Sequence, residues 1–399
     1  MMMSGVYLKD LGADNILIGM TGALQLPWTL KFAWAPLIDF YGKKKNWITN
    51  AQIILAILLG VLAATTYTQD PIRVGIAAMA FIALASATHD AAIDGYYLEA
   101  LTKPQQALFV GVRNTAFRLS MIFGSGGMVC VAGMLASSMG KTNAWFTSFA
   151  IMAVVMLLLF LLHKFYLPDS SKMGDSAGAQ HQQTVSADEY FMAIWSYFQQ
   201  PGSFAIVLYI LLFRLGDAMV MKMITPFLQD PRSAHGMGLT VAQIGTVFGT
   251  VGVCFLLLGG LLGGFLVSKQ GLKRWFWPAT LLMNSTILLY FMLALFHPSS
   301  IVWIYIVNSL EQFGYGFGMA SYTVFLLSTV KQEYKAAHYA VASALMAVGL
   351  MGPNMASGYL QQSLGYANFF LMSFFLTIPG MISIFFLPLW KKEDPEPAT

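Results

Sequence analysis

Residues 46–68 read NWITNAQIILAILLGVLAATTYT, 23 positions without a charged side chain. A helix needs about 20 mostly apolar residues to cross a bilayer, so this stretch predicts a transmembrane helix. The whole chain of 399 residues has the same character, since 57% of it is hydrophobic and 10% is charged. Soluble domains carry roughly a quarter charged residues. The composition therefore predicts an integral membrane protein, in which lipid covers the apolar surface, and argues against a soluble enzyme.

Similar stretches recur on both sides of residues 46–68, and about eleven of them are long enough to span a membrane. A polar segment rich in Ser, Gln and Gly interrupts them and is typical of a flexible linker. The predicted organisation is an N-terminal helical half at 1–166, a linker at 167–200, a C-terminal helical half at 201–390 and a tail at 391–399. The expected spans are 15–38, 46–68, 74–100, 106–137, 143–166, 203–228, 241–267, 276–296, 300–330, 337–361 and 366–389.

The basic residues predict the orientation of these spans. Lys and Arg in short loops favour the cytoplasmic side. With the linker and C-terminus inside, thirteen basic residues fall on that side and four on the other. The sequence therefore predicts a cytoplasmic linker and C-terminus, and its net charge of +4 reflects loop topology and not nucleic-acid binding.

The two blocks of spans resemble each other. Residues 35–45 align with 264–274 at an offset of 229, as expected of parallel repeats in a transporter with a central cleft. In the same alignment, residues 6–10 resemble 226–230, which end the first span of the second block. The repeat therefore predicts that the first span lacks its beginning, about 18 residues, through a misassigned start codon or a truncated product. The alternative is a genuine carrier of eleven spans.

The segment Asp39-Phe-Tyr-Gly42-Lys-Lys-Lys45 resembles the signature loop of the major facilitator superfamily, with Ala35 in place of the first family glycine and Phe40 in place of an arginine. More narrowly, the chain resembles the AmpG-type muropeptide permeases and their acetyl-CoA-transporter relatives. The segments that carry this likeness are 26–39, 87–97, 111–118 and 214–218.

This resemblance implies an all-α fold of two six-helix halves in the bacterial inner membrane. It also implies import of anhydromuropeptides, GlcNAc-anhydroMurNAc with attached peptide, together with protons. The alternatives are transport of another amphiphile (a drug, an acyl-CoA or a peptide) and a truncated chain that transports nothing. A membrane enzyme or receptor is the rival from a different class.

Charged groups inside a span are costly and usually functional. His89, Asp90 and Asp94 lie in one predicted span, and the two carboxylates, four residues apart, share a helix face. Two carboxylates in a low dielectric are hard to ionise together, which suits a proton carrier. The structural alternative is an ion pair with Arg113 or Arg118 of the next span. Either arginine could instead bind substrate carboxylates, or snorkel to the inner surface.

In the second block, Arg214 and Asp217 are three residues apart and are expected to neutralise each other on one face. Lys222 has no acidic residue three or four positions away in the sequence and, like Lys31 in the first block, is a candidate for binding an anionic substrate. All four residues are candidate substrate-binding groups.

Glu311 is a further candidate for proton coupling, and Gln312 beside it for substrate binding. Three glycines at alternate positions follow them, Gly314, Gly316 and Gly318. Glycines in a membrane helix allow close helix contact or bending. We therefore expect other helices to pack tightly here.

The loop with Asp39, Gly42, Lys43, Lys44 and Lys45 is expected to act as a conformational switch, making charge contacts to neighbouring helices in one state. The alternative is that its positive charge only sets the orientation of the helices in the membrane.

Several motifs are absent from the sequence: no GxxxxGK[ST] phosphate loop, no G-x-S-x-G nucleophile and no metal-ligand cluster among its six histidines and two cysteines. We therefore expect a transporter and not an enzyme, with no cofactor. Its expected partners are a small sugar–peptide, protons and the lipid bilayer, with no nucleic acid, and the protein is expected to be a monomer.

Overall fold

The structure is a computed structural model that describes residues 2–31, 34, 37–38, 42–101, 105, 109, 116–117, 119–169, 187–331 and 335–388. Arg113, Arg118 and Asp39 lie outside these residues, so their predicted roles remain predictions. Every regular element in the described part of the chain is a helix, which confirms the predicted all-α membrane fold.

Seven stretches of the described chain are long and apolar enough to cross a membrane. Two of these, Leu119–Tyr166 and His338–Phe386, have 48 and 49 residues. At 1.5 Å per residue each would reach about 70 Å, more than twice the hydrocarbon thickness. Each contains a glycine in the left-handed region, Gly140 (φ 80°) and Gly365 (φ 71°), where one helix ends and another begins. Seven stretches therefore correspond to more than seven crossings, and the exact number of spans remains a prediction.

The chain forms two compact units. The first consists of Met1–Thr184 with Met223–Val253, and the second of Val185–Lys222 with Cys254–Thr399. This grouping does not test the predicted division into two halves, a linker and a tail, which remains a prediction.

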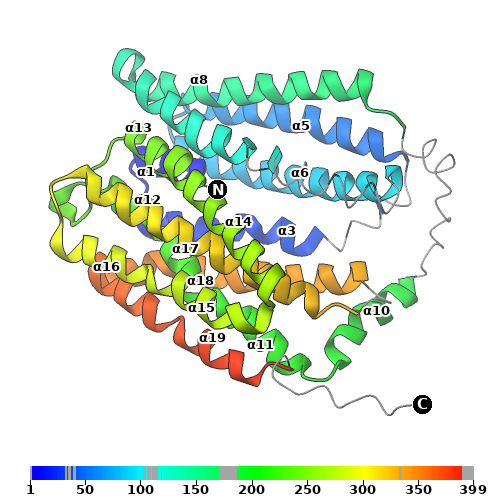
Figure 1. Cartoon of the computed structure of the whole chain (residues 1–399). Helices are drawn as coiled ribbons and strands as arrows, with labels where there is room; N and C mark the ends of the chain where they lie inside the picture. The colour runs from blue at the N-terminus through cyan, green and yellow to red at the C-terminus, as the bar shows by residue number, and fades with distance from the viewer. Residues whose placement is uncertain are drawn as a thin grey trace, which may run out of the picture. The chain divides into compact units, whose positions relative to one another are not determined.

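In the first unit, the long helices α5, α6 and α8 pack side by side (Figure 1). α6 begins at Pro71, and its N-cap Asp70 accepts a hydrogen bond from the Arg73 amide, a cap that satisfies a free donor at the helix start. The helices of this unit are α1 (Met2–Asp10), α2 (Asn15–Met20), η1 (Thr21–Gln25), α3 (Leu26–Leu30), α5 (Lys44–Thr65), α6 (Pro71–Ala100), η3 (Ile122–Gly127), α8 (Met128–Tyr166), η5 (Arg232–Ala234), α13 (Val241–Ile244) and η6 (Gly245–Gly252).

In the second unit, α17 packs against α15 through its glycines, as expected. A Cβ at Gly314 would lie 3.1 Å from the Leu282 carbonyl oxygen, and one at Gly318 would lie 2.6 Å from the Met283 sulfur. The helices of this unit are α10 (Ala187–Gln199), α11 (Ser203–Phe213), α15 (Leu272–Ser285), α16 (Ile287–Phe296), α17 (Ile301–Ser328), α18 (Lys335–Phe375), α19 (Ile378–Ser383) and η7 (Ile384–Phe386). Two further helices, α12 (Leu215–Gln229) and α14 (Val253–Gln270), have residues in both groups.

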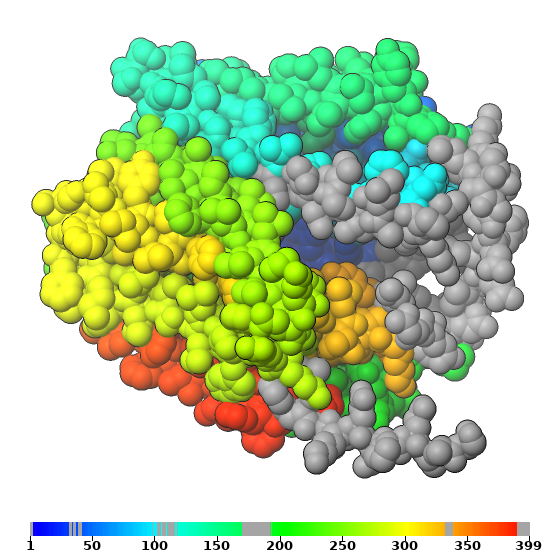
Figure 2. All heavy atoms as spheres, in the orientation of Figure 1, coloured from blue at the N-terminus to red at the C-terminus, as the bar shows by residue number. Residues whose placement is uncertain are grey.

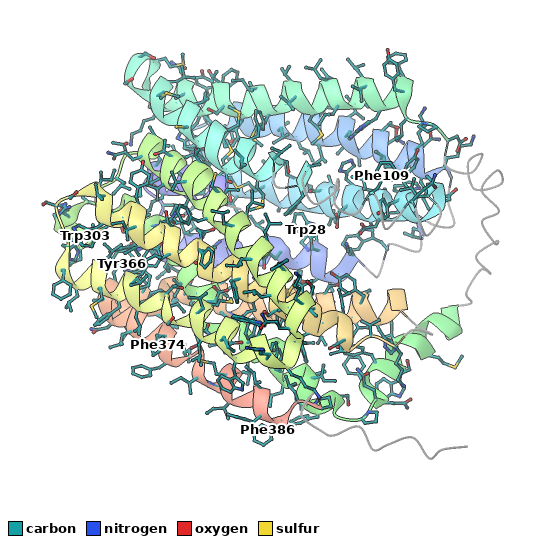
Figure 3. The ribbon with its side chains drawn as sticks, viewed as in Figure 1. Trp28, Phe109, Trp303, Tyr366, Phe374 and Phe386 are labelled. Atoms are coloured by element: carbon teal, nitrogen blue, oxygen red, sulfur yellow. The ribbon has the colours of Figure 1, made fainter. Side chains whose placement is uncertain are left out.

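The outward surface is apolar, as lipid contact requires. α8, which lies on the surface in Figure 2, exposes Leu158, Leu162 and Phe165. In the second unit Trp303 and Phe386, labelled in Figure 3, are 55% and 69% exposed at the beginning of α17 and the end of η7. Exposed aromatic rings near the ends of spans are typical of the two membrane interfaces.

Candidate substrate and proton site

The first unit contains a cluster of three charged side chains, Lys31, Asp90 and Asp94. The Lys31 ammonium donates to Asp90 Oδ2 at 2.7 Å and lies 3.4 Å from Asp94 Oδ2. The two aspartates are one turn apart on α6, and Lys31 follows α3, which packs on α6. Each side chain is between 31% and 40% exposed, so the cluster is open to a ligand.

The sequence interpretation did not pair Lys31 with these aspartates and offered Arg113 or Arg118 instead. Lys31 is 59 positions from Asp90 in sequence. Only the packing of α3 on α6 brings them together. One lysine between two carboxylates leaves a formal charge of −1 when all three are ionised.

His89 precedes Asp90 on α6 and is partly buried. Its Nε2 has no hydrogen-bond partner among the described residues. Adjacent helix positions point in different directions, so His89 does not share the face of the two aspartates.

The second unit contains a more deeply buried group. Arg214 lies at a break between α11, which ends at Phe213, and α12, which begins at Leu215. Its Nε and Nη2 both donate to Asp217 Oδ2, at 2.8 and 2.6 Å. Both side chains are less than a tenth exposed, which confirms the expected pairing of these two residues. An ion pair held away from water is stable only if its geometry is good and its remaining groups find partners.

Tyr315 supplies such a partner and was missed by the sequence analysis. Its hydroxyl accepts a hydrogen bond from Arg214 Nη2 at 3.1 Å, and its ring lies 5.1 Å from the guanidinium carbon. A sequence signal was present, because Tyr315 follows the candidate Glu311 by four positions and therefore shares its helix face.

Glu311 is buried on α17, and its Oε2 accepts a hydrogen bond from the Gln312 side-chain amide at 2.8 Å. It is close enough to Asp217 to interact with it electrostatically. The group formed by Arg214, Asp217, Tyr315, Glu311 and Gln312, here called the arginine cluster, thus holds one cation and two carboxylates.

The remaining described candidates are Lys222 and the residues of the loop. Lys222 lies seven residues beyond the start of α12, and its substrate role remains a prediction. In the loop, Lys43 forms an ion pair with Asp169, and the Lys44 ammonium donates to the Ile38 carbonyl oxygen at 3.1 Å. Gly42 adopts φ 79°, which a side chain would disfavour. The switching role of this loop remains a prediction.

A cavity of about 340 Å³ lies elsewhere in the first unit, at the end of α1. The lysines that line it are both paired, Lys9 with Asp230 at 2.6 Å and Lys141 with Asp10 at 2.8 Å. Its charges therefore cancel, and it contains none of the predicted site residues. Among the described residues, no group of three or more His, Cys, Asp or Glu side chains could hold a metal ion.

Transporters are among the known proteins that this chain resembles. An uncharacterized protein of Haemophilus influenzae is 28% identical over 98% of this chain and 90% of its own. The anhydromuropeptide permease of Escherichia coli is 24% identical over 95% of this chain and 74% of its own. Putative AmpG transporters of Rickettsia species show similar identity.

Solved structures share the fold. A mutant of the nucleoside transporter NupG superposes with a TM-score of 0.69 at 16% identity, covering 98% of this chain and 95% of that one. A POT family transporter in complex with a thioalcohol-conjugated peptide gives a TM-score of 0.70 at 14% identity, with coverage of 98% and 93%.

The family model described as Major Facilitator Superfamily matches residues 1–353. With helical spans, buried charges and relatives of the AmpG type, the chain is a multi-pass membrane protein that belongs to the major facilitator superfamily of transporters.

Proposed function

We propose that this protein imports anhydromuropeptides across the bacterial inner membrane together with protons, with its C-terminus in the cytoplasm. The observation that carries the coupling is the arginine cluster, in which one buried cation, Arg214, lies beside two buried carboxylates, Asp217 and Glu311. The bacterial relatives named anhydromuropeptide permease and AmpG support the substrate.

The cluster can couple a proton to a substrate by charge balance. Arg214 is paired with Asp217, so an ionised Glu311 would leave an uncompensated charge in a low-dielectric interior, which is costly. A proton on Glu311 removes that charge. Proton binding and a neutral cluster are therefore linked.

A peptide carboxylate can compete for the same guanidinium. Arginine binds carboxylates through two parallel hydrogen bonds, so a substrate carboxylate can take Arg214 from Asp217. Asp217 would then lose its cation, and an ionised Glu311 beside it would be costlier still, so substrate binding favours a proton on Glu311. Substrate and proton thus enter the cluster together, which is what symport requires.

The open cluster around Lys31 also has groups that suit such a substrate. Its ammonium can donate to sugar or peptide oxygens, while Asp90 and Asp94 can accept from sugar hydroxyls or a peptide ammonium group. A sugar–peptide offers all of these groups in one molecule.

Uptake by the purified protein in proteoliposomes tests the proposal. With radiolabelled GlcNAc-anhydroMurNAc-tripeptide outside, an inward proton gradient should drive accumulation that a protonophore abolishes. Glu311→Gln should lose accumulation by at least tenfold yet still exchange labelled for unlabelled substrate, because a permanently neutral side chain can bind substrate but cannot release a proton.

Accumulation that is indifferent to the proton gradient would contradict the coupling. Transport of a free drug, an acyl-CoA or an unrelated peptide, without transport of the muropeptide, would contradict the substrate.

A further inference from the structure

A line of polar side chains runs along one face of α17, from the middle of the helix to its end. Glu311, Tyr315, Tyr322 and its C-cap Thr329 are spaced by four, seven and seven residues, which places them on one side of the helix. At 1.5 Å per residue the line covers about 27 Å. It ends on the side that the basic residues predict to be cytoplasmic.

Two hydroxyls, that of Tyr322 in this line and that of Tyr209 beside it, have no hydrogen-bond partner among the described residues. Tyr322 and Tyr209 of α11 are fully buried with ring centroids 5.9 Å apart, and neither hydroxyl bonds to another described residue. Buried hydroxyls in native proteins are nearly always hydrogen-bonded, often to an ordered water. Two such groups in neighbouring positions indicate a small internal water site.

Phenylalanine rings lie against both tyrosines. Phe213 stacks on Tyr322 at 4.6 Å, and Phe325 lies edge-on to Tyr209 at 4.8 Å. Neither phenylalanine ring offers a hydrogen-bonding group to the two hydroxyls, so water is the partner that fits them.

Both ends of the line join hydrogen-bonded groups. Towards the middle of the membrane, the Tyr315 hydroxyl accepts from Arg214 at 3.1 Å, which connects it to the arginine cluster. At the other end, the hydroxyls of Tyr197 on α10 and Thr329 lie 3.1 Å apart. Burial raises the pKa of the Tyr197 hydroxyl, so that it stays protonated and able to donate.

A buried imidazole fixes this end of the line. The ring of His338 lies edge-on to Tyr197, with centroids 5.2 Å apart, and its Nε2 is 2.7 Å from Ser196 Oγ. Its Nδ1 accepts from the Lys331 amide at 3.3 Å, so Nε2 carries the proton and donates to Ser196. His338 is therefore a positioning residue that holds α10 and Tyr197 against Thr329.

We propose that these hydroxyls form a proton-release path inside the second unit, from Glu311 through Tyr315, water at Tyr322 and Tyr209, and Tyr197 to the inner surface. Each hydroxyl or water accepts a proton on one side and passes its own on the other. The net change is that the Glu311 carboxyl becomes a carboxylate and one proton reaches the cytoplasmic solution. The path rests on the proposed function, because it has a task only if Glu311 carries the coupling proton.

The test is to remove the two unpartnered hydroxyls. Tyr209→Phe, Tyr322→Phe and the double variant keep the rings and should fold. In proteoliposomes with an internal pH dye, each single variant should slow substrate-driven proton delivery about fivefold and the double variant more, while substrate exchange stays unchanged. Tyr366→Phe removes the hydroxyl of another buried tyrosine of the same unit, away from the line, and should behave as wild type.

The outcomes separate the two proposals. A wild-type protein that moves substrate without protons overturns the proposed function. If the wild type is coupled and the single and double Tyr→Phe variants deliver protons as fast as Tyr366→Phe, only the path is overturned. Variants that lose substrate exchange and proton delivery equally would also overturn the path, because the hydroxyls would then have a structural role.

Discussion

Lys31 changes what Asp90 and Asp94 can do, because a shared cation removes the repulsion that two carboxylates on one helix face would otherwise feel. The two aspartates are not equivalent in this arrangement, since the lysine is 0.7 Å nearer to Asp90 (2.7 against 3.4 Å). The cluster therefore works as a unit of one cation and two anions, similar in charge to the arginine cluster in the second unit.

This asymmetry leads to a prediction for Lys31. Lys31→Gln should leave two uncompensated carboxylates and reduce gradient-driven accumulation at least tenfold, and Asp90→Asn should cost more uptake than Asp94→Asn because it removes the shorter contact. Initial rates and accumulation ratios in proteoliposomes measure both effects.

A matched control lies at the start of α6, the helix that carries Asp90 and Asp94. Arg73 and Asp70 form an exposed ion pair there. Exposed pairs contribute about 0–1 kcal/mol, so Arg73→Gln should leave uptake and melting unchanged. Lys31→Gln with wild-type accumulation would remove this cluster from the mechanism.

At the scale of the element, two glycine-rich π-helical turns, η3 and η6, pack backbone against backbone. A Cβ at Gly126 would lie 2.6 Å from the carbonyl carbon of Gly249, and a Cβ at Gly249 would overlap the Cα of Gly126. Small residues let membrane helices approach this closely, and π-helical turns often mark functional positions. The contact therefore has no room for a side chain.

We predict that Gly249→Ala destabilises the protein by about 1–3 kcal/mol, the usual cost of overpacking, and lowers uptake. Thermal unfolding in detergent, followed by size-exclusion chromatography, measures the loss. Gly264→Ala is the control, because a Cβ there meets nothing within 4 Å and alanine favours a helix over glycine. Equal melting of the two variants would show that this contact tolerates separation of the helices.

At the scale of the whole molecule, the distribution of basic loops predicts which ends of the helices face the cytoplasm. Ser268 near Lys269 should then be inside, and Ser299, between α16 and α17, outside. Both positions are exposed, so each can carry a label.

The corresponding test uses cysteine variants in a background where Cys130 and Cys254 are replaced. A membrane-impermeant maleimide should label Ser299→Cys in intact cells, and should label Ser268→Cys only after permeabilisation. The reverse pattern would invert the predicted topology, and with it the direction of the proposed proton-release path.

The sequence by itself determined the class of the molecule. Its apolar stretches have the length of the bilayer and admit only helices, because a backbone in lipid must satisfy its own hydrogen bonds. The pairing of Arg214 with Asp217 was also predictable, since three residues on a helix bring two side chains together whatever surrounds them. The same helix spacing would also have placed Tyr315 on the helix face of Glu311.

Contacts between distant segments were decided by the tertiary structure alone. Lys31 meets Asp90 across 59 positions, and Tyr197 meets Thr329 across 132. No periodicity relates such residues; their distances depend on how whole helices pack, which follows from side-chain shape and from glycine contacts such as Gly126 on Gly249. The identity of the charged residues is thus readable from the chain, while their partners, and with them the chemistry of each cluster, follow from the packing of the helices.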